Sequence, residues 1–206
     1  MEFIKRQFGE LKAFYRKDYG HFLFITAVAF LVLVVLSYVG GLLLREQAMS
    51  LMEWFGEQVA QLGVMDDAGD FSALALFLNN SRAMIVGAAY GFIPFLYLPA
   101  LSLGVNAMLL GVFASVYSAQ GLSLLLYLAG ILPHGIFELP ALVLSIACGL
   151  YLCRTITDYV RHNTKGTVRS ALADIARVIV INILPLLLIA AAVEANITPV
   201  IMKLFA

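Results

Sequence analysis

The chain has 206 residues, of which 62% are hydrophobic and only 13% are charged, and its formal net charge is zero. A soluble domain carries about a quarter charged residues and fewer than half apolar ones. So many apolar side chains do not fit inside one core of this size, which excludes an ordinary soluble domain and predicts an all-α polytopic membrane protein. At about 20 residues per crossing, five spans and their connections fill residues 1–206 as a single membrane domain.

The first 21 residues form a basic tail, with five Lys and Arg residues against three acidic ones. Ile4, Phe8, Leu11 and Tyr15 recur at helical spacing. This pattern fits an amphipathic helix that lies on an anionic cytoplasmic leaflet, and it fits a solvated tail equally well.

Residues 22–44 contain no charged side chain and predict the first span, which is too long for the core of a cleaved signal peptide. The acidic segment 45–70 follows. Within it Leu51, Phe55, Val59 and Leu62 form an apolar stripe that predicts an amphipathic helix near 46–64, resting on the membrane or on the spans. The contrast between the basic tail and this acidic segment predicts a cytoplasmic N-terminus and an outer position for the segment.

Only Glu138 is charged between Arg82 and Arg154, whereas residues 154–177 are rich in Arg and Lys and read as cytoplasmic. An odd number of crossings must therefore separate this basic segment from the acidic one. We expect three, at about 83–97, 98–117 and 136–153, followed by a last span at 175–193. The C-terminus of this multi-pass cell-membrane protein then lies outside.

Residues 122–132 are apolar but too few to cross, and Pro133, Gly135 and Pro140 follow them. We therefore expect a re-entrant or broken helix near 122–135. In the second span Gly87 and Gly91 have the spacing of a close-packing pair, which serves either intramolecular packing or self-association. The oligomeric state stays open.

Three ionisable residues lie inside apolar segments: His134, Glu138 and Glu194. Such residues are costly in a membrane and are candidates for function. His134 and Glu138 share one helix face, and the predicted threading places all three near the outer surface. Asn79 and Asn80, just before the second span, belong to the same side.

Three interpretations of this polar cluster remain. It is a hydrogen-bonded knot that ties two spans together, an ion or proton relay, or a metal site in which His134, Glu138 and Glu194 hold an ion such as zinc. No cofactor is expected otherwise, because the sequence has no phosphate-binding loop, nucleophile elbow or cysteine cluster. The basic segment is too small for a nucleic-acid surface.

The strings PHGIFELPALVLSIACGL (133–150), FLNN (77–80) and IAAAVEANITP (189–199) resemble the stage II sporulation protein M family, in order and over nearly the whole chain. One departure is visible, because Val105-Asn106-Ala107 stands where the family pattern has Asn-Gly. The resemblance implies a multi-pass membrane scaffold that gathers peptidoglycan hydrolases during engulfment in sporulation. It gives no settled chemical role to the three ionisable residues.

Three functions follow as hypotheses. The first is a membrane scaffold that docks membrane or cell-surface proteins such as peptidoglycan hydrolases, and this reading makes the chain more a binding protein than an enzyme. The second is a transporter or channel for ions, lipid or small solutes that uses the polar cluster. The third is a membrane-embedded metal-dependent hydrolase.

Overall fold

The computed structural model describes residues 2–61, 72–163 and 166–205, and within them every regular element is a helix. In chain order these are α1 (Glu2–Arg16), α2 (Asp18–Leu43), α3 (Arg45–Gln61), α4 (Ala73–Ala89), η1 (Tyr90–Phe92), α5 (Pro99–Ala119), α6 (Leu124–His162), α7 (Thr167–Val178), the π-helical η2 (Ile179–Ile183), α8 (Leu184–Asn196) and α9 (Thr198–Phe205). The predicted all-α class is confirmed.

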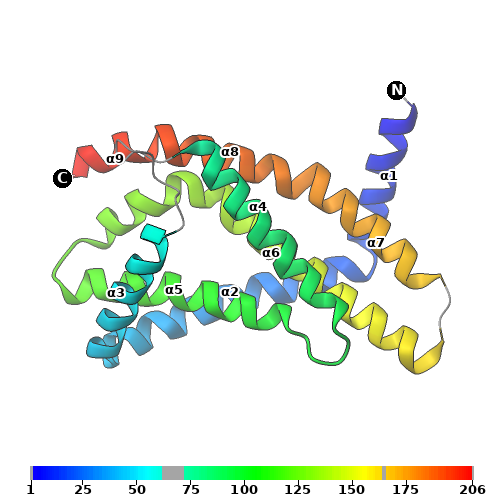
Figure 1. Ribbon diagram of the computed structural model, residues 1–206, viewed down its shortest axis with the longest axis horizontal. Helices are drawn as coiled ribbons and strands as arrows, with labels where there is room; N and C mark the ends of the chain where they lie inside the picture. Colours follow the sequence, from blue (N-terminus) through cyan, green and yellow to red (C-terminus); the bar gives the residue numbers. More distant parts are fainter. Residues whose placement is uncertain (1, 62–71, 164–165, 206) are drawn as a thin grey trace.

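The helices form an elongated bundle whose two chain ends lie at opposite ends of its long axis (Figure 1). We call these the N-terminal end, where α1, the α4–α5 turn and the end of α6 lie, and the C-terminal end, where α3, the α5–α6 turn and α9 lie. The chain runs along the long axis five times, in α2, in α4, in α5, in α6 and in the continuous α7–η2–α8 segment. These passages follow the order of the five spans expected from the sequence.

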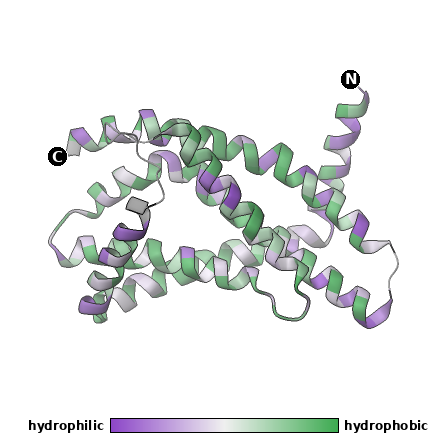
Figure 2. Cartoon of the chain, viewed as in Figure 1, coloured by the Kyte–Doolittle hydropathy of each residue, from purple (hydrophilic) through white to green (hydrophobic). Residues whose placement is uncertain are grey.

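Four of the described helices are long and apolar enough to cross a membrane: Tyr19–Leu43, Pro99–Ala119, Leu124–His162 and Thr167–Asn196. The fifth passage, α4, has 17 residues and is about 26 Å long. Figure 2 shows a hydrophilic patch in its middle, where Asn79, Asn80 and Arg82 lie. The count of about five spans is thus roughly met, with α4 as the least apolar passage.

The face of the bundle that would meet lipid is apolar. Phe24, Leu31, Val35 and Leu43 of α2 are each 60% or more exposed. In a membrane such side chains are in contact with acyl chains, so their exposure carries no cost there.

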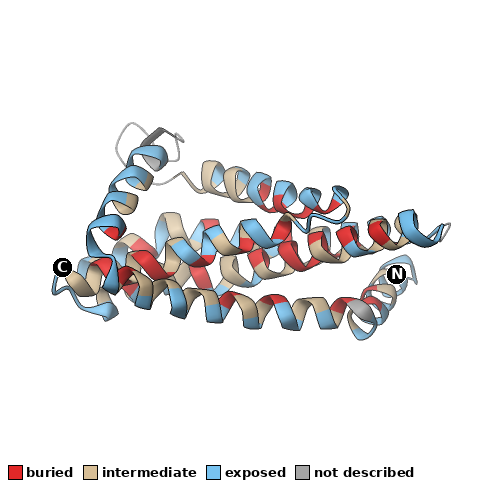
Figure 3. Ribbon diagram, turned by 90° about the horizontal axis from the view of Figure 1, so that it is seen from below, coloured by how far each residue is buried: buried red, intermediate tan, exposed pale blue. Residues whose placement is uncertain are grey.

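Figure 3 shows the buried residues on the inner sides of the packed helices. Helix α6 carries more buried residues than any other described helix, whereas α3 is largely exposed. Helix α6 contacts α2, α4, α5, α7, α8 and α9 and is therefore the central helix of the bundle. Ala141, Ile146, Ala147 and Cys148 on α6 are at most 1% exposed. The small side chains among them, Ala141, Ala147 and Cys148, let the neighbouring helices approach closely.

The expectation of a separate re-entrant helix near 122–135 was wrong. Helix α6 is continuous from Leu124 to His162, and both Pro133 and Pro140 lie inside it. Its 39 residues span about 58 Å, well beyond the 30 Å apolar core of a bilayer. A proline removes one backbone hydrogen bond and bends a helix without ending it where neighbours hold both sides. Contacts with α8 and α9 supply that support here.

Helix α4 also begins earlier than expected. Ser72 caps it, with its side-chain oxygen accepting a hydrogen bond from the backbone N–H of Ala75 at 3.3 Å. Asn79 and Asn80 therefore lie within α4, not in front of it. The Ser72 cap sets the start of the helix. The expected start was later because the charged Arg82 indicated the end of the preceding polar segment.

The predicted amphipathic helix near 46–64 is α3 up to Gln61, and residues 62–64 lie outside the described residues. Leu51 packs against the cluster formed by Ala48, Val112 and Val116, and the ring of Phe55 lies 5.3 Å from that of Phe113 on α5. Of the two alternatives left open for this helix, the structure shows contact with a span.

The N-terminal tail forms a helix that docks on the bundle, whereas the sequence left open a helix on the leaflet and a solvated tail. Arg177 on α7 pairs with Glu10, and its Nε donates a hydrogen bond to Gln7 Oε1 at 2.7 Å. These two contacts hold α1 against α7. The Tyr15 hydroxyl donates to Asn182 Oδ1 at 3.3 Å. Burial raises the pKa of Tyr15 to about 12, so this donor keeps its proton at neutral pH.

Candidate functional site

The polar cluster is built from α6, α8 and α9. His134 on α6 and Glu194 on α8 form an ion pair through Nδ1 and Oε2, and their side chains are 15% and 19% exposed. Thr198 Oγ1 on α9 lies 3.4 Å from the same Nδ1. The central helix α6 and the two last helices, α8 and α9, thus meet at one imidazole ring.

Glu138 completes the cluster. It lies one turn after His134 on α6 and interacts electrostatically with both His134 and Glu194. Apart from its ion pair with His134, Glu194 Oε2 makes no hydrogen bond to the described residues. Glu194 therefore contacts the imidazole directly and Glu138 acts on it through space, in a largely buried setting where the local field of each group acts strongly on the others.

Asn79 and Asn80 are not joined to this cluster. Both lie on α4, which packs against α6 and α8. No hydrogen bond or ion pair of the described residues links either amide to His134, Glu138 or Glu194. The structure therefore brings together the three ionisable residues and leaves the two asparagines outside.

The helix-breaking positions have a packing role here. Gly135 is buried within α6, and an added Cβ would lie 3.2 Å from Ile131 Cγ2. Pro133 and Pro140 flank the turn that carries His134 and Glu138. The backbone carbonyls that these prolines leave without a partner lie one turn earlier, at the same depth as the polar cluster.

Gly87 and Gly91 lie in the contact of α4 and η1 with α6. A Cβ on Gly91 would lie 2.9 Å from the carbonyl carbon of Gly149, and one on Gly87 would touch Ile146 Cδ1 at 3.4 Å. Pro99 closes the other side of Gly149. In this structure the pair serves close packing within the chain.

Metal binding has no geometric support in the part of the chain that the structure describes. No group of three or more His, Cys, Asp and Glu side chains there has the geometry to hold a metal ion. Glu194 instead pairs with Nδ1 of His134.

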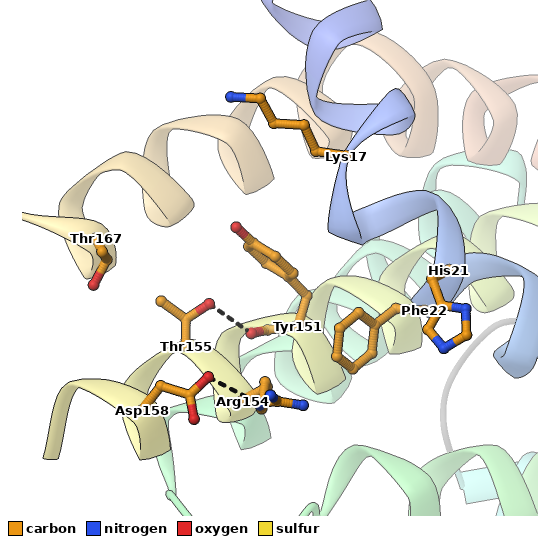
Figure 4. A pocket seen from close by; sticks show the side chains of 8 residues that line it. All are labelled: Lys17, His21, Phe22, Tyr151, Arg154, Thr155, Asp158 and Thr167. Atoms are coloured by element: carbon orange, nitrogen blue, oxygen red, sulfur yellow. Dashed lines mark hydrogen bonds and ion pairs between the residues drawn. The ribbon is translucent and has the colours of Figure 1, made fainter. Parts of the chain in front are cut away.

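Sequence reasoning missed two features. Thr198 joins the cluster, and its place four residues after Glu194 was the available signal. The second is a cavity of about 520 Å³ at the N-terminal end, which Figure 4 shows between the α1–α2 corner, α6 and the start of α7. Its lining residues come from three separate segments, 17–22, 151–158 and Thr167, so no single sequence motif predicts the cavity.

The fold and the polar cluster define a class, that of polytopic helical membrane proteins with ionisable side chains at an interhelical contact. The family model of stage II sporulation protein M matches residues 21–199, and the chain belongs to this family. The family resemblance of the sequence motifs is thereby confirmed.

One relative is an uncharacterized protein of Methanocaldococcus jannaschii, with 31% identity over 130 residues that cover 63% of this chain and 72% of that protein. No solved structure matches the chain. The comparisons thus give the family and its membrane character, and they assign no activity.

Proposed function

We propose that the protein is a membrane scaffold that holds cell-surface proteins, such as peptidoglycan hydrolases, at the membrane through the exposed face of α3. The name of its family suggests sporulation, in which such remodelling takes place. One observation carries the proposal: α3 packs on the bundle by one face, and its opposite face is exposed among the residues that the structure describes.

The two faces of α3 are separated at helical spacing. Ala48, Leu51 and Met52 face the bundle. The opposite face carries an exposed apolar and acidic surface, which we call the α3 surface: Glu46, Met49, Glu53, Trp54 and Glu57. Trp54 is 56% exposed. A large aromatic side chain among charges of one sign is typical of a protein contact site.

The charge of the α3 surface defines the partner. Glu46, Glu53 and Glu57 outnumber Arg45 on the described helix. A partner with a basic surface around an apolar pocket for Trp54 would complement it. We further propose that this surface lies outside the cell, with the N-terminus in the cytoplasm, because the basic residues concentrate at the N-terminal end.

Site-specific photo-cross-linking in native membranes tests the scaffold. A photoreactive residue at position 54 should give an adduct with a cell-surface protein, identified by mass spectrometry. The adduct should disappear when Glu53→Lys and Glu57→Lys reverse the charge beside it. A photoreactive residue at Phe24, which faces lipid, is the matched control. Identical adducts at both positions, or only lipid adducts at position 54, would refute the proposal.

A transporter remains the second candidate, because three ionisable groups share a half-buried site between helices that span the membrane. Flux of protons, ions or small solutes into vesicles that hold the purified protein, abolished by Glu138→Gln, would establish it. A scaffold predicts equal, background flux for both proteins.

A further inference from the structure

One charged side chain lies on the outside of the bundle, partway along a passage. Arg82 is near the middle of α4 and is exposed. It belongs to the part of α4 where Figure 2 shows a hydrophilic patch. Within the part of the chain that the structure describes, no hydrogen bond or ion pair engages its guanidinium.

The contacts of α4 with α6 give the depth of Arg82 in the membrane. Met84, two residues further along α4, accepts a hydrogen bond through its backbone carbonyl from Ser145 Oγ on α6. Arg154 is the next charged residue of α6, nine residues after Ser145. At 1.5 Å per residue, Arg82 lies at most about 16 Å from the level of Arg154. In the other direction α4 extends nine residues to Ala73, about 14 Å. Arg82 is therefore near the middle of an apolar core of about 30 Å.

The exposed side of α4 has the pattern of a helix-packing seam. Ser81, Met84, Gly87 and Ala88 are buried on the side that faces the bundle. Residues spaced seven apart lie along the opposite side, which we call the α4 outer face: Ala75, Leu78, Asn79, Arg82, Val86 and Ala89. Alanines seven residues before and after Arg82 leave room for another helix to approach closely.

Neither the chain nor the lipid supplies a counter-ion at this place. Glu138 and Glu194 belong to the helices on which α4 packs, but both are engaged in the polar cluster with His134. Acyl chains have no acceptor to offer, and the phosphates of either leaflet are further away than an arginine side chain reaches. Arginine in a membrane interior is costly and is generally paired with an acidic side chain or a carbonyl group.

A second copy of the chain offers no such acid either. The α4 outer face contains no Asp or Glu. Two copies that packed by this face about a twofold axis would bring their Arg82 side chains toward each other. The charge of the face therefore favours a different partner, one that carries a carboxyl group at the middle of the membrane.

We propose that the α4 outer face binds a transmembrane helix of another protein, and that Arg82 pairs with an Asp or Glu side chain near the middle of that helix. The contact lies within the membrane. It is independent of the α3 surface, because α3 packs on α2 and α5. The failure of either proposal leaves the other standing.

Model transmembrane peptides test the pairing with the purified full-length chain in phosphatidylcholine vesicles. Three leucine-alanine peptides differ only at the central residue, which is Glu, Gln or Lys. Energy transfer from a donor on the protein to an acceptor on the peptide measures association. The Glu peptide should bind about tenfold more tightly than the Gln peptide, the size of one strong interhelical polar contact.

Variants of Arg82 show whether this residue is responsible. Arg82→Gln should remove the preference for the Glu peptide, and Arg82→Glu should transfer the preference to the Lys peptide. Lys12→Gln is the matched control, since it removes one exposed cation outside the candidate spans and should leave the preference unchanged.

Stability gives a second, independent measurement. Arg82→Leu should raise the unfolding midpoint of the isolated protein in mixed micelles, because it replaces a cation without a partner on an apolar surface. A lower midpoint would show that Arg82 is already paired within its own chain and would overturn the proposal. Equal binding of the Glu and Gln peptides, or an unchanged preference in Arg82→Gln, would overturn it as well. Energy transfer between two labelled copies that depends on Arg82 would assign the face to self-association and would also overturn it.

Discussion

The carboxylate of Glu194 on α8 is paired with the imidazole of His134 on α6, and the hydroxyl of Thr198 on α9 lies 3.4 Å from the same ring nitrogen. The pair closes the contact between the central helix and the last helices of the chain. Within apolar surroundings such polar contacts specify which helix faces pack together.

The first prediction concerns this pair. His134→Gln and Glu194→Gln should each destabilise the protein in detergent, and a double-mutant cycle should give a coupling of about 0.6 to 1.7 kcal/mol. Reversible unfolding in mixed micelles measures it. Asn196→Ala is the control, since its amide bonds Ala192 O in its own helix. A coupling near zero would show that the ion pair contributes no stability.

The second prediction concerns glycine packing. Gly91→Ala places a methyl group against the backbone of Gly149, which cannot move aside, and should cost about 1 to 3 kcal/mol. Gly104→Ala on α5 is the matched control, because nothing lies within 4 Å of its added Cβ. The control should be neutral or stabilising, owing to the helix propensity of alanine. Equal unfolding midpoints for both variants would contradict the close α4–α6 contact.

The third prediction concerns the α4–α5 turn. Phe95 and Tyr97 have left-handed backbones, with φ of 69° and 47°, and the Phe95 N–H donates to Thr157 Oγ1 on α6 at 3.0 Å. Thr157→Val removes this acceptor and should cost about 1 to 3 kcal/mol. Thr157→Ser keeps the hydroxyl and should lose far less. Hydrogen exchange at Phe95 should accelerate in the valine variant alone.

The fourth prediction concerns threading. Single cysteines at positions 54 and 121 should react with a membrane-impermeant maleimide from one side, and a cysteine at 162 from the other. Cys148 and Cys153 are buried and should stay unlabelled. Intact cells compared with inverted vesicles make the measurement. Labelling of positions 54 and 162 from the same side would overturn the five-passage threading and the proposed outer position of the α3 surface.

Two asparagines show where local pattern stops being informative. Asn182 reaches across to Tyr15, as a polar residue in a span is expected to do, whereas Asn106 bonds Ser102 O in its own helix at 2.8 Å. The sequence offers the same side chain in both places. The neighbours that packing supplies decide which partner it finds.

The sequence by itself determined the membrane class, the passages along the bundle and the shared face of His134 and Glu138, because hydropathy, charge bias and helical spacing are local properties. It did not determine that α6 continues through Pro133 and Pro140, because contacts from other helices supply the support that holds a proline-containing helix together. It did not reveal the cavity at the N-terminal end or the role of Thr198 either. Those depend on which helix faces meet in space, and only the tertiary structure decides that.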